Sequence, residues 1–349
     1  SNDTATASPK GPLTVTRTLQ AASSAAANAL PTNTGLLTAL FSADDIRDNV
    51  FPQGTDFGYY DRGSATPNPQ LQRIDFSNDT TTATGRGPTT LQIYRASAVS
   101  NASHGYFAGG QDFSGPTVSV SRVDRIDYGN DTAAASPKGP LTGARYALAG
   151  TGNVNFGYFG GGGTPTYLSV VDRIDYSNDT ATAAAKGNLS DTHAFFAAIG
   201  NQSFGYFAGK WMSNSKVDRV DYSNDTATAS PKGNMARSGN NGFTAGTGNA
   251  NFGYIGGGGY GGDVSLIDRI DYSNDTATAV VKGPLTAVTA YHSATGNASS
   301  GYYAAGGPSS ISKVDRIDYS NDTATAAAKG PLSIARRTVS YTHLTLPTI

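Results

Sequence analysis

Short segments in which apolar and polar residues alternate recur along the whole chain, separated by turn-forming clusters. One such segment reads FGYFGGGG at 156–163 and another reads VDRIDY at 171–176. A period of two predicts half-buried β-strands. A small-residue segment, ARYALAGTG at 144–152, comes before this pair, and a Thr/Ala run follows the Asn-Asp-Thr step at 178–180. Each unit therefore predicts four short strands, with the small-residue strand innermost, where the strands are most crowded.

The spacing of these units indicates the architecture. The aspartate of the Asn-Asp-Thr step recurs at intervals of 76, 52, 48, 46, 50 and 47 residues. Five of these six intervals are near the roughly 40–50 residues of a four-stranded propeller blade. The pattern predicts an all-β protein, a β-propeller of four-stranded antiparallel blades. The repeated aspartates are Asp3, Asp79, Asp131, Asp179, Asp225, Asp275 and Asp322.

The two ends of the sequence indicate how many blades to expect. Residues 1–8 resemble an outer strand and residues 334–343 an inner strand, and together they would supply two strands of one further blade. We therefore expect six complete blades plus a partial seventh, with a seven-bladed ring favoured and a six-bladed ring as the alternative. The propeller would span residues 1–343, with an insertion at about 23–52, in a chain that looks like a fragment. Residues 344–349 leave the repeat and are interpreted as a non-native tail.

Composition excludes several classes of function. The chain has 349 residues, a net charge of -1 and only 15% charged residues, so a nucleic-acid partner bound through bulk positive charge is not expected. No apolar run approaches the ~20 residues that cross a bilayer. Because there is no cysteine and the four histidines lack metal-ligand spacing, we expect no metal and no cofactor.

The repeated carboxylates predict structure rather than catalysis. A catalytic pair needs two carboxylates in different environments, whereas Asp172 and Asp175 of the Asp-Arg-x-Asp motif recur from unit to unit. Pairing between blades with the motif's arginine is the simpler interpretation. The Asn-Asp-Thr step also reads as a glycosylation sequon, but its strict repetition favours turn chemistry. We predict no catalytic residue.

At this point the repeat resembles the kelch family. Tyr158-Phe159-Gly160-Gly161, Ile174-Asp175-Tyr176 and Asn178-Asp179-Thr180 follow the order of a kelch blade, and an arginine opens the next inner strand at Arg145, Arg237 and Arg336. The resemblance implies a propeller that binds partners on the face that carries its inter-blade loops. That face would be basic, and the opposite face, with the Asn-Asp turns, acidic. The expected basic residues are Lys138, Lys186, Lys232, Lys282, Arg145 and Arg237.

The loops between the second and third strands differ most among the units. They lie on the same face as the inter-blade loops in an up-and-down blade, and near-identical scaffolds with unlike loops favour a recognition surface. Exposed aromatics are typical anchors of such surfaces. The predicted contacts are Phe113, Tyr167, Trp211 and Tyr260.

These observations favour a non-enzymatic binding or structural propeller that recognises a protein or glycan through its variable loop face. Highly repetitive propellers of this kind resemble predicted surface and virion proteins, so an extracellular, cell-surface or virion setting is favoured over the cytoplasm. Two alternatives stay open. One is a carbohydrate-active enzyme, a hydrolase or lyase, with a site at the axial mouth; the other is an intracellular kelch adaptor.

Overall fold

A computed structural model of the chain describes residues 57–61, 70–112, 114, 116–210, 214–237, 241–259, 262–307, 309–337 and 341–343. The chain divides into two units, residues 1–46 and 47–349, and all described residues belong to the second. The expected N-terminal outer strand, the insertion at 23–52 and the tail at 344–349 lie outside the described residues.

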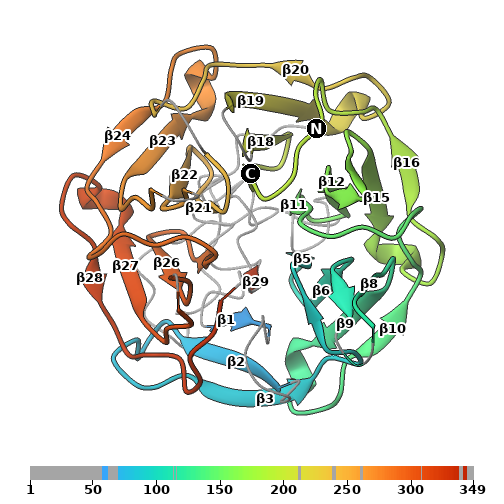
Figure 1. The fold of residues 1–349 in the computed structure, drawn as a ribbon, viewed down its shortest axis with the longest axis horizontal. Helices are drawn as coiled ribbons and strands as arrows, with labels where there is room; N and C mark the ends of the chain where they lie inside the picture. Colours follow the sequence, from blue (N-terminus) through green and yellow to red (C-terminus); the bar gives the residue numbers. More distant parts are fainter. Residues whose placement is uncertain are drawn as a thin grey trace, which may run out of the picture. The chain divides into compact units, whose positions relative to one another are not determined.

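Six four-stranded antiparallel sheets make up this unit, and we number them as blades in chain order (Figure 1). None of these sheets closes on itself within the described ranges. From inner to outer strand, blade 1 is β29 (Tyr341–His343), β1 (Phe57–Tyr60), β2 (Gln70–Asp75) and β3 (Thr84–Pro88); blade 2 is β5 (Ser97–Ser100), β6 (His104–Ala108), β9 (Val123–Asp127) and β10 (Ser136–Lys138); blade 3 is β11 (Ala149–Gly152), β12 (Phe156–Gly160), β15 (Val171–Asp175) and β16 (Ala184–Lys186). Blade 4 is β17 (Ala197–Gly200), β18 (Phe204–Lys210), β19 (Asn214–Asp221) and β20 (Ser230–Pro231); blade 5 is β21 (Ala245–Gly248), β22 (Phe252–Gly256), β23 (Ile267–Asp271) and β24 (Val280–Lys282); blade 6 is β25 (Ser293–Gly296), β26 (Ser300–Ala304), β27 (Val314–Asp318) and β28 (Ala327–Ala328).

Smaller elements decorate the blades. The chain between blade 1 and blade 2, together with a loop of blade 2, forms a three-stranded sheet, and a loop of blade 3 forms a hairpin. A short 3-10 helix follows the third strand in five blades, where the Asp of Ile-Asp-Tyr caps it: in blade 3 the Asp175 carboxylate accepts a hydrogen bond from the Ser177 amide. The turn predicted for this junction is present, but the side chain that accepts the backbone amide is that of Asp175 and not that of the Asn-Asp-Thr aspartate. These elements are β4 (Ile93–Tyr94), β7 (Gln111–Asp112), β8 (Val118–Ser119), β13 (Gly163–Thr164), β14 (Thr166–Tyr167), η1 (Tyr128–Asn130), η2 (Tyr176–Asn178), η3 (Tyr222–Asn224), η4 (Tyr272–Asn274) and η5 (Tyr319–Asn321).

The blades follow one another around a common axis. The inner strands pack side by side in the order β29, β5, β11, β17, β21, β25 and back to β29 (Figure 1). The small residues of these strands, such as Ala149 and Gly150 in β11, allow six of them to meet around the axis. The described residues therefore form a six-bladed propeller, which was the alternative count.

The expectation of a seventh blade is wrong for the described residues. The C-terminal strand β29 does not begin a new blade but pairs antiparallel with β1, where Gly58 lies opposite His343. The last blade also bonds to the first: the Gly330 amide donates to the Asp79 carbonyl at 2.8 Å. Because the neighbouring contacts of blade 6 are made by blade 1, a further blade has no place between them.

Packing between blades buries one side of each sheet against the next. Tyr158 and Val171 of blade 3 pack with Phe207 and Val220 of blade 4, and all four are at most 1% exposed. The same arrangement joins blade 6 to blade 1 through Tyr302 and Ile74. The apolar residues that alternate with polar ones along each strand therefore point into the interface between two blades.

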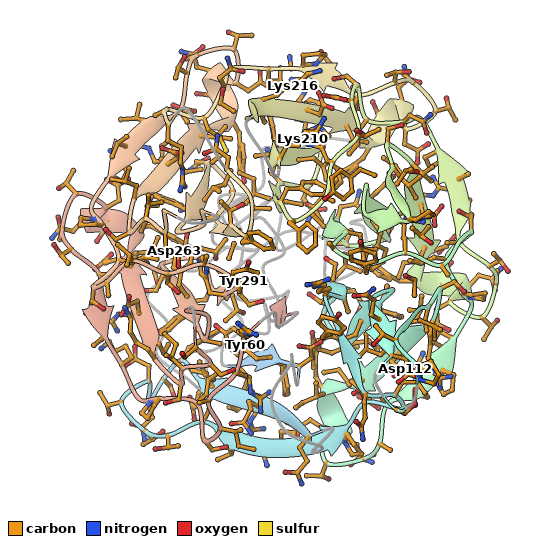
Figure 2. All side chains as sticks on the ribbon, viewed as in Figure 1. Tyr60, Asp112, Lys210, Lys216, Asp263 and Tyr291 are labelled. Carbon is orange, nitrogen blue, oxygen red and sulfur yellow. The ribbon has the colours of Figure 1, made fainter. Side chains whose placement is uncertain are left out.

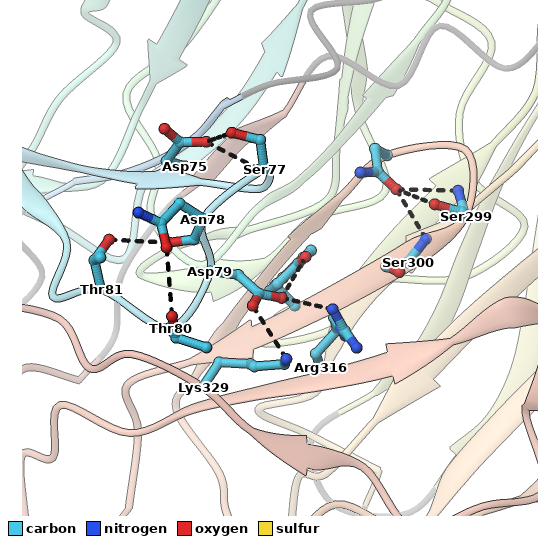
Figure 3. A network of polar contacts seen from close by, with 12 residues as sticks. Asp75, Ser77, Asn78, Asp79, Thr80, Thr81, Ser299, Ser300, Arg316 and Lys329 are labelled. Carbon is cyan, nitrogen blue, oxygen red and sulfur yellow. Dashed lines mark hydrogen bonds and ion pairs between the residues drawn. The ribbon is translucent and has the colours of Figure 1, made fainter.

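A recurring polar arrangement, which we call the inter-blade cluster, joins each pair of neighbouring blades. At its centre is the aspartate of the Asn-Asp-Thr step. The Asp79 carboxylate accepts from the Tyr302 hydroxyl at 2.9 Å and pairs with Arg316 at 2.8 Å and Lys329 at 3.1 Å, all from blade 6 (Figure 3). The corresponding aspartates of the other five blades bind the preceding blade through Tyr59, Arg73 and Arg86 to Asp131; Tyr106, Arg125 and Lys138 to Asp179; Tyr158, Arg173 and Lys186 to Asp225; Tyr206, Arg219 and Lys232 to Asp275; and Tyr254, Arg269 and Lys282 to Asp322.

Next to each cluster the backbones of two blades nearly touch. The glycine after the basic residue donates its amide across the interface, as Gly233 does to the Asp275 carbonyl at 2.8 Å. A Cβ on Gly233 would lie 1.8 Å from the Ala277 carbonyl oxygen, which no side chain could tolerate. The repeated Lys-Gly step therefore encodes a close approach of two blades as well as the end of a strand.

The predicted pairing between blades is confirmed for the arginine of Asp-Arg-x-Asp, but its partner differs from the one expected. Arg173 binds Asp225 of the next blade at 2.7 Å, so the Asn-Asp-Thr aspartate is the inter-blade carboxylate. The first aspartate of the motif is buried within its own blade: Asp172 is 0% exposed and accepts from Thr142 and Arg145. The second caps the 3-10 helix. Three aspartates of one repeat thus have three structural roles.

Candidate binding site at the axial mouth

Two sets of loops meet at one end of the propeller. The connector into each inner strand and the loop between the second and third strands of the preceding blade lie together because their backbones bond. The Gly162 amide donates to the His193 carbonyl at 2.7 Å, and the Gly258 amide donates to the Thr289 carbonyl at 2.7 Å. This end, with both sets of loops, is the loop face expected from the up-and-down order of the strands.

A row of residues with left-handed backbones runs around the axis on this face. In five connectors, the residue two positions before the inner strand has φ between 56° and 59° although it is not glycine. The row is held by backbone hydrogen bonds from blade to blade: Ala147 N to Arg95 O at 2.8 Å, and Phe195 N to Ala147 O at 3.0 Å, for example. We call these five residues the axial row: Arg95, Ala147, Phe195, Phe243 and Tyr291.

The backbone of the axial row is strained, because none of its five residues is glycine. A left-handed conformation costs a non-glycine residue about 1–2 kcal/mol, because Cβ approaches the following carbonyl oxygen. Strain of this kind is often found at functional sites, where the surrounding structure over-determines it. The backbone geometry is the same in five blades, whereas the side chains are one arginine, one alanine and three aromatics. Side-chain identity is therefore the feature that distinguishes the blades here.

The aromatic members of the axial row form a contiguous arc. The ring centroids of Phe195 and Phe243 are 4.6 Å apart, and those of Phe243 and Tyr291 are 4.0 Å apart. Tyr146 meets Phe195 edge-on at 5.9 Å. Tyr291 lies on the axial side of its blade (Figure 2). The arc presents aromatic surface around the axis of the propeller.

Arg95 stands at one end of this arc. Its guanidinium carbon is 5.1 Å from the ring centroid of Phe195, 5.6 Å from that of Tyr146 and 4.8 Å from that of Tyr94. Ala147 lies between Arg95 and Phe195 in the row, and its small side chain lets the guanidinium reach the ring. The mouth therefore combines a cation with aromatic faces.

Two small cavities lie along the axis at this end. One of about 80 Å³ is lined by the axial row together with Thr244 and His292, and another of about 70 Å³ is lined largely by the inner strands. Burial, and then the nearby Arg237, lowers the pKa of His292 to about 3, so its imidazole is neutral at ordinary pH. A hydrogen bond with the Gly256 backbone acts in the opposite direction on the pKa of His292. Within the described ranges, the Thr244 hydroxyl is buried without a hydrogen-bond partner. Such a group gains free energy from a polar ligand or water.

The predicted aromatic contacts fall partly in this region. Tyr167, in β14, is half-buried, and burial first and Tyr146 second raise its pKa, while Arg95 acts in the opposite direction. Tyr167 is thus within electrostatic reach of Arg95 and Tyr146 at the mouth. Phe113, Trp211 and Tyr260 lie outside the described residues.

The predicted basic residues are not where the sequence placed them. Lys138, Lys186, Lys232 and Lys282 have side chains at most 13% exposed and bind the inter-blade aspartates at 3.0–3.3 Å. The expected division into a basic and an acidic face is therefore wrong for these residues, because the lysines and the Asn-Asp-Thr aspartates neutralise each other between blades.

The two predicted arginines are also buried in ion pairs. Arg145 is 1% exposed and binds Asp172 at 2.8 Å. The Arg237 side chain is 7% exposed and binds Asp268 at 2.8 Å, and it also donates to the Ile255 carbonyl. Both hold the first aspartate of Asp-Arg-x-Asp in their own blade, and they do not point out of the mouth as expected.

Sequence reasoning missed the axial row. Its members lie in segments interpreted only as small-residue inner strands, and left-handed geometry has no signature when the residue is not glycine or asparagine. A signal was present nonetheless: when the units are aligned on the inner strand, a bulky residue interrupts the small ones at 195, 243 and 291.

Comparison with known proteins adds no assignment. No family model matches the chain, and no curated protein matches it. Across the described part of the chain, no group of three or more His, Asp or Glu side chains gathers in a way that could hold a metal ion. No described helix is both long and apolar enough to span a membrane.

Proposed function

We propose that this protein is a non-catalytic binding propeller of kelch-like design, which recognises a protein or glycan through its loop face. The observation that carries the proposal is the axial row: one strained backbone position repeated in five blades and occupied by different side chains, mostly aromatic. A frame that keeps its backbone geometry while its side chains vary suits recognition. The aromatic arc would be the anchor, and the variable loops would surround it.

The use of the carboxylates supports binding over hydrolysis. Glycoside hydrolysis needs two carboxyl groups at a free site. The carboxylates of the repeat are instead committed to the inter-blade cluster, to Arg145-type pairs and to helix caps. The residues that line the two axial cavities include no Asp or Glu. An extracellular, cell-surface or virion setting belongs to the same proposal, as does relationship to the kelch family.

The test is a binding screen of glycans and displayed peptides with the intact chain and with a Phe243→Ala, Tyr291→Ala double variant. We expect the selected ligands to bind the variant at least tenfold more weakly, because it loses two adjacent rings of the arc. A matched control is Val280→Ala, Val281→Ala on the outer strand β24, where both side chains are about half exposed. Unchanged binding by the mouth variant, or turnover of a bound glycan, would contradict the proposal.

A further inference from the structure

Arg95 differs from the arginines of the repeat in its partners. The Asp-Arg-x-Asp arginines each bind a carboxylate at 2.7–2.8 Å. Arg95 has no carboxylate partner among the described residues, and its guanidinium makes one hydrogen bond there, from Nη1 to the Gln111 side-chain oxygen at 3.2 Å. Its Nε is buried with no partner in the same part of the chain. Among the described residues, four of the five N–H donors of this cation therefore bind no protein group.

The surroundings of Arg95 strengthen its interaction with an anion. Three aromatic rings lie within 5.6 Å of the guanidinium carbon, and Arg95 is half-buried. A charge-assisted hydrogen bond at such a partly desolvated group is stronger than one in bulk water. The residues that line the adjoining cavity include no carboxylate to compete for the guanidinium.

The same cavity also favours a ligand with hydroxyl groups. Thr244 is 7% exposed and its hydroxyl has no hydrogen-bond partner among the described residues, and the neutral imidazole of His292 lines the same cavity. Phe243 and Tyr291 supply aromatic surface beside them. A ligand that satisfies this set carries an anionic group, a ring face that packs on aromatics, and hydroxyls.

We infer that the axial mouth binds a sugar acid, with the carboxylate on the Arg95 guanidinium, a hydroxyl on Thr244, and the ring face against Phe243 and Tyr291. This rests on the proposed binding function and gives its ligand a chemical class. The cavity of about 80 Å³ accommodates the carboxylate edge of one terminal sugar, and the rest of a glycan would extend over the loop face. An aromatic acid shares the carboxylate and the ring but would leave the Thr244 hydroxyl without a partner.

The experiment measures dissociation constants by calorimetry or ligand-observed NMR for three probes: glucuronate, glucose and benzoate. We expect glucuronate to bind about tenfold or more tightly than either of the others, since glucose lacks the charge and benzoate the hydroxyls. Arg95→Gln should weaken glucuronate about tenfold or more and leave glucose nearly unchanged. Arg95→Lys should restore only part of the affinity, because an ammonium lacks the planar fork. Thr244→Val should weaken glucuronate and not benzoate.

Several results would overturn the inference. They are glucuronate binding no tighter than glucose, benzoate binding as tightly as glucuronate, Arg95→Gln without effect, and no binding of any probe. Urea unfolding of each variant separates lost folding from lost binding. If Arg95 has no role but the Phe243→Ala, Tyr291→Ala variant still loses the ligands of the screen, the sugar-acid assignment fails while the binding function stands.

Discussion

Replacing the central carboxylate of one inter-blade cluster should weaken the whole propeller. Asp225 is 7% exposed and accepts from the Tyr158 hydroxyl at 2.9 Å, from Arg173 at 2.7 Å and from Lys186 at 3.1 Å. Asp225→Asn keeps the shape but removes the charge, which leaves two cations facing each other across the interface between blades 3 and 4. The change is local, yet every blade of the ring depends on both its neighbours.

The magnitude follows from the burial of the partners. Removing one member of a buried ion pair costs about 3–5 kcal/mol. The Arg173 side chain is 25% exposed and the Lys186 side chain 13%, so water can rehydrate part of their charge. We therefore expect the free energy of unfolding to fall by about 2–3 kcal/mol. With a urea slope of about 3 kcal/mol/M, the unfolding midpoint should fall by about 0.7–1 M.

The matched control uses another aspartate of the same repeat. Asp221 only caps the 3-10 helix, where its carboxylate accepts from the Ser223 amide and hydroxyl at 2.9 and 2.7 Å. Asp221→Asn makes the same change in charge and should cost less than about 1 kcal/mol. A double-mutant cycle with Arg173→Gln should show coupling with Asp225→Asn and none with Asp221→Asn. Equal destabilisation by the two aspartate variants would refute the role assigned to the inter-blade cluster.

Three further predictions test the frame. Gly233→Ala should lower stability by about 3 kcal/mol or more, because its Cβ would meet the Ala277 carbonyl, whereas Gly143→Ala, with no atom near its Cβ, should be almost neutral in thermal unfolding. Ala147→Gly should raise the urea midpoint by relieving about 1 kcal/mol of left-handed strain; a loss of stability would show that the position is not strained. Burial alone would raise the pKa of four inter-blade aspartates, but their lysine, arginine and tyrosine partners outweigh it and hold each pKa below its usual value. These groups therefore stabilise the fold above about pH 4, and stability should fall steeply as the pH drops further, which thermal unfolding from pH 6 to pH 2.5 would measure; a constant melting temperature over that range would contradict it. The four are Asp79, Asp179, Asp225 and Asp322.

The sequence by itself determined the repeat, the strand order and the blade. The alternation in VDRIDY and FGYFG placed strands correctly, because a half-buried strand needs a period of two regardless of its neighbours. The turn at Asn-Asp-Thr could be predicted because its backbone hydrogen bond, from Ala181 N to Asn178 O, reaches only three residues along the chain. Local rules were sufficient for everything that depends on local contacts.

Only the tertiary structure decided the blade count, the charge distribution and the candidate site. Six blades result from the pairing of β29 with β1 and from the contacts of Asp79 with blade 6, and these join residues more than 200 positions apart. The sequence predicted exposed lysines, but in the structure their ammonium groups bind carboxylates of the next blade. Arg95 and the aromatic arc come from five connectors that meet only at the axis. Residues that a ring brings together have no characteristic spacing in the sequence. The sequence therefore predicted the strands of each blade but not the site at the axial mouth.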